Sequence, residues 1–262
     1  MSFSLTANAR GALQMAMETV ESWRASANEV VWNVAGEDEP ILLLHGLAQS
    51  PRTLAPLREY LSRDLDRPTL DLAVGIGLGD IRDLAIRVHR ELEDQGVRQC
   101  DVVGYSMGGL VAAYLAKCLD HGRCIRRVVT LGTPHHGVPF LADWRGRLAL
   151  WRSAEQMRAG SALLEQLQRL PLPEGVRMLS IAGGGDSVVP PEAARLDGPR
   201  CRNLVVPGLD HWSLLTSRRT FRCVRDVLAD ARRDWAPPQL KKVESARPPV
   251  NLHAPWRLQE AR

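Results

Sequence analysis

The chain has 262 residues, of which 45% are hydrophobic and 24% charged, and this composition suits one soluble α/β domain with a sizeable core. No apolar run reaches membrane-spanning length, and the first ten residues lack the pattern of a signal peptide, so we expect a cytoplasmic protein. The net charge is only +4 and the arginines are dispersed, which speaks against nucleic-acid binding. The charge permits contact with a membrane surface but does not support it. The five cysteines include no C-x-x-C pair, so we expect reduced thiols rather than a disulfide framework or a zinc ribbon.

Apolar spacing predicts strands and helices that alternate along the first half of the chain. In order, these are a helix at 7–23, strands at 29–34 and 41–44, a helix begun by Ser50 and Pro51, a strand at 68–74, and a helix from Asp80 that stops at Gly96. The loop at 75–80 reads G-x-G-x-G rather than the G-x-G-x-x-G of dinucleotide sites. A flexible loop bordering a site is therefore favoured over a nucleotide site.

The second half continues the alternation. After a strand that leads into Ser106 it predicts, in order, a helix at 110–119, a strand at 127–131, a helical segment at 140–170, strands at 176–182 and 204–206, and a helix at 213–233. Prolines interrupt the chain from residue 234 onward. We therefore expect one domain at 1–233, followed by a proline-rich basic tail at 234–262.

Strands that alternate with helices indicate the α/β class, with a mostly parallel central sheet and helices on both faces. Ligands bind such sheets at the carboxyl ends of the strands. The loops that carry His45, Ser106, Thr133, Asp186 and His211 each follow a predicted strand. We expect these loops to share one rim of the sheet and to form a site there.

The sequence G-Y-S-M-G at 104–108 lies between a short apolar run and a helix-forming segment, which is the context of a nucleophile elbow. The alternative is a serine in an ordinary glycine-rich turn. In an elbow, a sharp turn projects the oxygen of Ser106 above the sheet, and glycines at 104 and 108 let the strand and helix backbones approach closely. The following helix directs free N–H groups toward a developing oxyanion.

A serine hydroxyl becomes a nucleophile when a base takes its proton and a carboxylate orients that base. Ser106, Asp186 and His211 follow one another in the order Ser…Asp…His, which is the order of the α/β-hydrolase fold. Asp210 is an alternative acid, and His135 and His136 are alternative bases that break this order.

Five segments carry a resemblance to a known family: LLLHGL at 42–47, GYSMGG at 104–109, LGTPHHG at 131–137, GDSVVP at 185–190 and DHWSLL at 210–215. Through them the sequence, over about residues 40–215, resembles the α/β-hydrolase superfamily and, within it, bacterial lipases and esterases. The resemblance implies the α/β-hydrolase fold. It also places a small helical cap or lid at 138–173, with plain packing helices as the alternative.

The resemblance also implies roles for individual residues. The backbone N–H groups of Leu47 and Met107 would form the oxyanion hole. His45 would support the oxyanion loop, and the loop of His135 and His136 would form a wall beside the pocket. The residues expected around the substrate are His45, Tyr105, Thr133, His135, His136 and Trp212. No cofactor is implied, and no specific ligand set for a metal is found.

These observations predict a serine carboxylic-ester hydrolase that acts through an acyl-enzyme on a small-molecule acyl ester or lipid with a hydrophobic part. An acyltransferase or thioesterase with the same three residues is an alternative. A non-catalytic binding protein on the same fold is another, because fold alone does not determine function. Acyl length and oligomeric state do not follow from the sequence.

Overall fold

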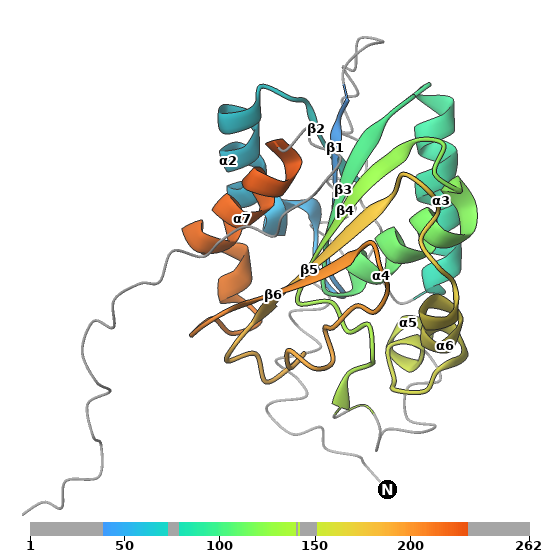
Figure 1. Cartoon of the computed structure of the whole chain (residues 1–262), viewed down its shortest axis with the longest axis vertical. Helices are drawn as coiled ribbons and strands as arrows, with labels where there is room; N and C mark the ends of the chain where they lie inside the picture. The colour runs from blue at the N-terminus through green and yellow to red at the C-terminus, as the bar shows by residue number, and fades with distance from the viewer. Residues whose placement is uncertain (1–38, 73–78, 140, 142–150, 230–262) are drawn as a thin grey trace, which may run out of the picture.

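The computed structural model describes residues 39–72, 79–139, 141 and 151–229 (Figure 1). Its centre is a sheet of six parallel strands in the order β2-β1-β3-β4-β5-β6. The strands are β1 (Ile41–Leu44), β2 (Thr69–Leu72), β3 (Cys100–Tyr105), β4 (Ile125–Leu131), β5 (Arg177–Gly183) and β6 (Cys201–Val206). The predicted α/β class and parallel sheet are confirmed.

Helices cover both faces of the sheet, with α2 and α7 on one face and α3, α4, α5 and α6 on the other (Figure 1). The α-helices are α2 (Ala55–Leu65), α3 (Ile81–Asp94), α4 (Met107–Tyr114), α5 (Arg152–Gln156), α6 (Ala162–Arg169) and α7 (Arg218–Ala229). Shorter turns of helix are η1 (Pro51–Leu54), η2 (Leu115–Asp120) and η4 (Ser213–Leu215); η2 is a π-helix that widens the end of α4.

Alternation along the strands divides the core into two layers, because successive side chains of a strand point to opposite faces. In β1, Leu42 and Leu44 pack in the layer under α3 and α4, whereas Ile41 and Leu43 pack under α2 and α7. All four side chains are at most 1% exposed. This burial on both faces explains why the strand is apolar throughout, as parallel sheets require.

The predicted continuous helical segment at 140–170 is wrong, because the structure breaks it into α5 and α6. Between them Gly160 takes a φ of +72°, which ends one helical direction, and Ser161 begins the next. The Ser161 Oγ accepts the N–H of Leu164 at 3.3 Å and donates to the Gln156 carbonyl at 2.6 Å. The hydrogen bonds of Ser161 thus make it the residue that begins a new helix, although the apolar spacing alone predicts one continuous helix.

Other boundaries also differ from the predictions. The helix after the elbow begins at Met107 rather than at 110, and β6 begins at Cys201 rather than at 204. The predicted helix at 213–233 is a 3-10 turn followed by α7. Ser50 precedes η1, but its side chain makes no capping hydrogen bond there, whereas Asp80 does cap α3 by accepting the Arg82 N–H at 2.8 Å.

The helices of the predicted cap are fastened to the main domain through Gln156. Its side chain donates to the Asp80 carboxylate at 2.7 Å and accepts the N–H of Ile81 at 2.8 Å, so one residue of α5 satisfies the start of α3. The predicted helix at 7–23, the strand at 29–34, most of the loop at 75–80 and the tail at 234–262 lie outside the described residues. Within the described part, no helix is both long and apolar enough to span a membrane.

Candidate active site

Ser106 occupies a sharp turn between β3 and α4. Its φ of 52° and ψ of −120° are strained for a residue with a Cβ, and its N–H is held by the Leu131 carbonyl of β4 at 2.8 Å. The strand–turn–helix context predicted for an elbow is present. The turn projects the hydroxyl at the carboxyl end of the sheet, where the loops after β1, β4, β5 and β6 also lie.

Close packing around the turn depends on glycine. A Cβ at Gly104 would lie 2.5 Å from the Cα of Gly109, and one at Gly108 would overlap the carbonyl oxygen of Leu44. The helix therefore crosses directly over β1 and β3 with backbone against backbone, which is the close approach that only glycine permits.

Three predicted side chains from separate loops form one hydrogen-bonded chain. The His211 Nε2 lies 3.2 Å from the Ser106 Oγ, and the His211 Nδ1 lies 2.7 Å from the Asp186 Oδ2. Asp186 is 4% exposed and His211 is 5% exposed, so little water competes for these contacts. The other oxygen of Asp186 accepts two backbone N–H groups, those of Val188 at 2.9 Å and Val189 at 2.8 Å.

These partners determine the tautomer of His211. A carboxylate only accepts hydrogen bonds, so the proton lies on Nδ1 and the lone pair of Nε2 faces the serine. In this arrangement Nε2 can accept the hydroxyl proton of Ser106. The two N–H donors on the other oxygen stabilise the negative charge of Asp186 and keep its carboxyl group in a fixed orientation.

The alternative acid and bases do not enter this chain. Asp210 is exposed and accepts the N–H and the hydroxyl of Ser213, each at 2.7 Å, whereas the ring nitrogens of His211 contact Asp186 and Ser106. These bonds lower the pKa of Asp210. Neither His135 nor His136 contacts Ser106 among the described residues; both bond to other partners described below.

The backbone N–H groups of Leu47 and Met107 are the predicted oxyanion hole, and the loop before Leu47 approaches the serine closely, since a Cβ at Gly46 would lie 3.2 Å from the Ser106 Cβ. The Met107 N–H is the first of α4 and has no acceptor within its own helix. Within the described ranges, neither of these two groups donates to another protein group. The loop that carries Leu47 is held by Gln49, whose side chain accepts the Gly46 N–H at 3.0 Å. No motif or spacing in the sequence indicated that Gln49 holds this loop.

Tyr105 lies beneath the site rather than in contact with a substrate, contrary to its predicted role. Its side chain is 1% exposed, its ring centroid lies 5.0 Å from that of His211, and its hydroxyl donates to the His211 carbonyl at 3.1 Å. Burial raises the pKa of this phenol, so it stays a donor. As the last residue of β3, Tyr105 directs its ring to the α2 and α7 face, under the loop of the histidine.

Replacing Tyr105 with phenylalanine is expected to lower the free energy of unfolding by about 1–2 kcal/mol, because the buried His211 carbonyl loses its donor. Urea unfolding measures this loss. Tyr114→Phe is the matched control, since Tyr114 is half-buried and its hydroxyl makes no hydrogen bond within the described residues. Equal losses in the two variants would contradict the role given to the hydroxyl.

His45 and Thr133 are also buried, each with 0% of its surface exposed, so neither is placed to touch a substrate as the protein stands. The His45 Nδ1 donates to the Gly46 carbonyl at 3.0 Å, which agrees with support of the oxyanion loop. Burial lowers the pKa of His45 to about 4 despite that bond. Thr133 packs against Gly109, where any Cβ would collide with its hydroxyl.

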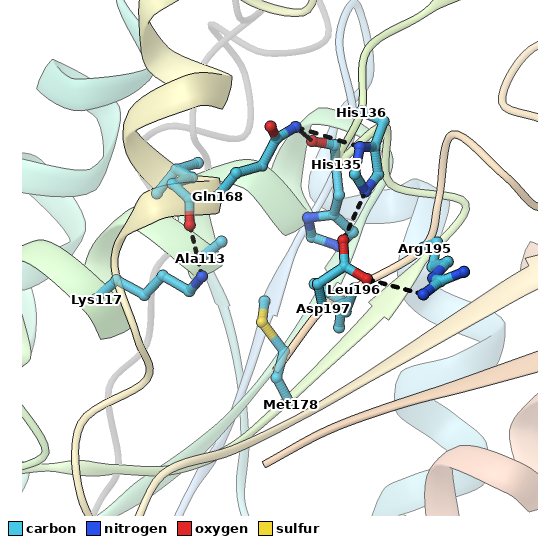
Figure 2. A pocket seen from close by; sticks show the side chains of 10 residues that line it. Ala113, Lys117, His135, His136, Gln168, Met178, Arg195, Leu196 and Asp197 are labelled. Atoms are coloured by element: carbon cyan, nitrogen blue, oxygen red, sulfur yellow. Dashed lines mark hydrogen bonds and ion pairs between the residues drawn. The ribbon is translucent and has the colours of Figure 1, made fainter. Parts of the chain in front are cut away.

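His135 and His136 belong to a pocket on the side of α4 and α6, which Figure 2 shows. His135 is 7% exposed and contacts the Thr130 hydroxyl through Nε2 at 3.1 Å, while Gln168 donates to its carbonyl at 2.9 Å. His136 is half-exposed and lies 3.4 Å from Asp197. None of Ser106, Asp186 and His211 lines this pocket. Both side chains line this pocket, and the role of their loop as a wall beside the serine stays a prediction.

The neutral burial of His135 predicts a loss of stability in mild acid. Burial, assisted by the nearby charges of Lys117 and His136, lowers the pKa of His135 to about 3, whereas an unfolded histidine titrates near 6.5. The contribution of neutral His135 to the free energy of unfolding is therefore complete above about pH 6.5. It is lost by up to about 1.4 kcal/mol per pH unit as the pH falls from about 6.5 toward the pKa of the folded state.

Urea unfolding between about pH 7 and pH 5 measures this slope. In His135→Gln the pH dependence of the free energy of unfolding is expected to be smaller by up to about 1.4 kcal/mol per pH unit, which corresponds to one proton. His45 contributes similarly in both proteins, so the difference between them reports on His135. A variant with the same slope as the wild type would show that His135 does not stay neutral in the folded state.

Two further residues contact His211. Trp212 is 61% exposed, and its ring meets the imidazole edge-on with centroids 5.8 Å apart, so it alone of the predicted substrate residues presents a large apolar surface at the site. Gly132 has a φ of 54°, and a Cβ there would lie 3.0 Å from the His211 Nδ1. In the sequence, only the position of Gly132 directly after β4 and before Thr133 indicated that it lies near the site.

In the described residues, no group of three or more histidine, cysteine, aspartate or glutamate side chains is arranged to hold a metal ion. The sheet order, the elbow and the loops on one rim define the class: the chain has the α/β-hydrolase fold, and in fold it resembles solved lipases.

Comparisons of sequence agree with this class. Residues 79–203 match the family described as the PGAP1-like alpha/beta domain. The palmitoyl-protein thioesterase-dolichyl pyrophosphate phosphatase fusion 1 of Schizosaccharomyces pombe is 31% identical over 119 residues, which is 40% of this chain and 19% of that protein. The chain thus spans about a fifth of the length of this curated relative.

Solved structures of similar fold include the mature Bacillus licheniformis lipase BlEst2, with a TM-score of 0.59 and 23% identity over 76% of this chain and 96% of that one. Phospholipase PlaB of Legionella pneumophila has a TM-score of 0.61 and 15% identity, covering 75% of this chain and 60% of that one. A monoacylglycerol lipase of Paleococcus ferrophilus has a TM-score of 0.50 and 16% identity, covering 71% and 92%. At these identities the likeness is one of fold.

Proposed function

We propose that this protein is a serine hydrolase that cleaves carboxylic esters with a hydrophobic acyl part. The observation that carries the proposal is the hydrogen-bonded chain from Asp186 through His211 to Ser106, with contacts of 2.7 Å and 3.2 Å. It is supported by the hydrolase fold and by the likeness to lipases. A cytoplasmic location and a lipid or small acyl-ester substrate belong to the same proposal.

In the first half of the reaction, His211 Nε2 takes the hydroxyl proton as the Ser106 Oγ attacks the acyl carbonyl carbon. The carbonyl oxygen becomes an oxyanion that accepts the N–H groups of Leu47 and Met107, each worth about 3–4 kcal/mol in the transition state. Asp186 stabilises the imidazolium. His211 then returns the proton to the leaving alkoxide, the ester C–O bond breaks, and an acyl-enzyme on Ser106 remains.

In the second half, a water molecule replaces the alcohol. His211 Nε2 takes one proton from it, the hydroxide attacks the acyl carbon, and the same two N–H groups bind the second oxyanion. The bond to the Ser106 Oγ breaks, and the proton on His211 goes to the serine oxygen. The acid leaves and the enzyme is restored. Trp212 offers an apolar surface for the acyl chain beside the reacting atoms.

A thioesterase is the second candidate, because the curated relative that matches this chain is named a palmitoyl-protein thioesterase fusion. The same residues serve either bond, since a thiolate leaves in place of the alkoxide. The acyl-enzyme is common to both, and only the leaving group differs.

The test is covalent labelling followed by a comparison of substrates. A fluorophosphonate probe is expected to modify the folded wild type at Ser106 and to leave Ser106→Ala unmodified. Ser62→Ala, which alters an exposed serine on α2, is expected to retain labelling. Absence of labelling in folded wild-type protein would refute the serine mechanism. Esters and thioesters of the same acyl chains, compared by kcat/KM, then decide between the two candidates.

A further inference from the structure

Two of the five cysteines meet at the end of the sheet opposite to Ser106. Cys100 is the first residue of β3, and Cys124 immediately precedes β4, the strand that pairs with β3 (Figure 1). Their sulfur atoms lie 3.4 Å apart, and both thiols are free. The sequence predicted reduced thiols and no disulfide framework. It did not predict that two thiols 24 positions apart would touch.

The backbone holds these two residues together from both sides. The Cys100 N–H donates to the Cys124 carbonyl at 3.0 Å. The carboxylate of Asp120, which is 2% exposed, accepts the N–H groups of Cys124 at 2.9 Å and of Ile125 at 3.0 Å. These bonds fix the turn before β4 and hold the Cys124 thiol against β3. Cys100 is the register partner of Ile125, the residue after Cys124, so the two cysteines are neighbours on adjacent strands, which lie about 4.8 Å apart. Disulfides span Cα separations of about 4.4–6.8 Å.

The two thiols differ in access and acidity. Cys100 is 1% exposed, whereas Cys124 is half-buried and reaches the surface. The hydrogen bond between the two thiols lowers the pKa of Cys124 and raises that of Cys100. A thiolate is the reactive form of cysteine, so Cys124 is the thiol that meets an oxidant first, with Cys100 directly behind it.

We propose that Cys100 and Cys124 form a redox pair that closes to an intrachain disulfide on reaction with a small-molecule disulfide such as oxidised glutathione. The Cys124 thiolate attacks one sulfur of the oxidant, which releases one glutathione thiolate and leaves a mixed disulfide. Cys100 then loses its proton and attacks the Cys124 sulfur, which releases the second glutathione thiolate. Two protein thiols are oxidised by two electrons in total, and one glutathione disulfide is reduced to two thiols.

The bond would enclose the elbow itself. The closed loop of roughly 25 residues contains β3, Ser106 and α4, the unit on which the candidate site is built. Closing it removes conformational freedom from the unfolded chain, so the oxidised protein is expected to unfold at a temperature several degrees higher than the reduced protein. The sulfur atoms need to approach by about 1.4 Å, which rotation of the two side chains supplies.

Full-length protein is equilibrated in glutathione buffers from fully reduced to fully oxidised, its free thiols are blocked, and it is digested with trypsin without reductant. Cleavage after Arg98, Lys117, Arg123 and Arg126 separates Cys100, Cys118 and Cys124 into the peptides 99–117, 118–123 and 124–126. Mass spectrometry is expected to find 99–117 joined to 124–126 in the oxidising buffers, and the join is expected to disappear on reduction.

The variants assign the order of events. Cys118→Ser, the matched control on η2, is expected to keep the link. Cys100→Ser is expected to accumulate glutathione on Cys124, and Cys124→Ser is expected to leave the buried Cys100 unmodified. The digest of the wild-type protein tests formation of the disulfide even if a variant fails to fold.

The proposal is overturned if 99–117 and 124–126 remain separate in the most oxidising buffer, if the link runs to Cys118, or if it joins two chains. Glutathione on Cys100 in Cys124→Ser would overturn the assigned order of attack. None of these measurements depends on ester hydrolysis, so the redox pair and the proposed activity stand or fall separately.

Discussion

Asp186→Asn is expected to lower kcat for ester hydrolysis by about 10⁴-fold while KM and the folded structure stay nearly unchanged. The physical reason lies in the two ends of the carboxylate. The Oδ1 of Asp186 accepts two backbone N–H groups, from Val188 and Val189, so this position requires an acceptor. An asparagine therefore places its carbonyl there and turns its amide NH₂ toward the Nδ1 of His211.

The amide donor then reverses the tautomer of His211. Two donors cannot face each other, so the imidazole moves its proton from Nδ1 to Nε2, and Nε2 loses the lone pair that accepts the proton of Ser106. The isosteric substitution thus removes the base without creating a cavity. Steady-state kinetics with a chromogenic ester, together with thermal unfolding, measure the two effects.

Asp210→Asn is the control for this experiment, because it makes the same chemical change next to His211 in a carboxylate that bonds to Ser213 instead. It is expected to alter kcat only slightly. If the two variants lost activity equally, or if Asp186→Asn retained most of it, then Asp186 would not be the residue that orients the base.

Gly108→Ala is expected to lower the free energy of unfolding by about 3 kcal/mol, and with it the yield of folded protein. The methyl group would overlap the carbonyl oxygen of Leu44 and lie 2.5 Å from that of His45. Both are backbone atoms of β1 and its loop, which cannot rotate away, so α4 must lift off the sheet. Helix propensity alone predicts the opposite sign, a gain of about 1 kcal/mol for alanine over glycine.

Gly79→Ala provides the matched comparison, because a Cβ there meets no atom of the described residues within 4 Å and its φ is not positive. This variant is expected to be neutral or slightly stabilising. Urea unfolding of both variants measures the difference. A Gly108→Ala protein as stable as Gly79→Ala would show that the helix does not rest on β1 as closely as the structure has it.

Local sequence was enough to predict the elements that signal their own environment. The strand at 41–44 is apolar at every position because both of its faces are covered, and Asp80 begins α3 because its side chain satisfies a free N–H. Ser106, Asp186 and His211 were found because each follows a strand, and parallel strands bring their carboxyl ends to one edge.

Helical spacing failed where a single turn outweighed it. The segment predicted as one helix at 140–170 contains Gly160 and Ser161, and the serine forms two local hydrogen bonds that favour a new helix start. Periodicity averages over many residues, so it does not register one residue whose side chain competes for the backbone.

The sequence by itself determined the fold class and the three residues that meet over the sheet, because apolar patterns, turn residues and chain order are local properties. Only the tertiary structure decided that Tyr105 supports His211 from below, that His135 and His136 face a different pocket, and that Cys100 touches Cys124. The physical reason is that spacing along a strand says which face a side chain takes, whereas its neighbours on that face come from other strands and helices whose register and packing are set by the whole core.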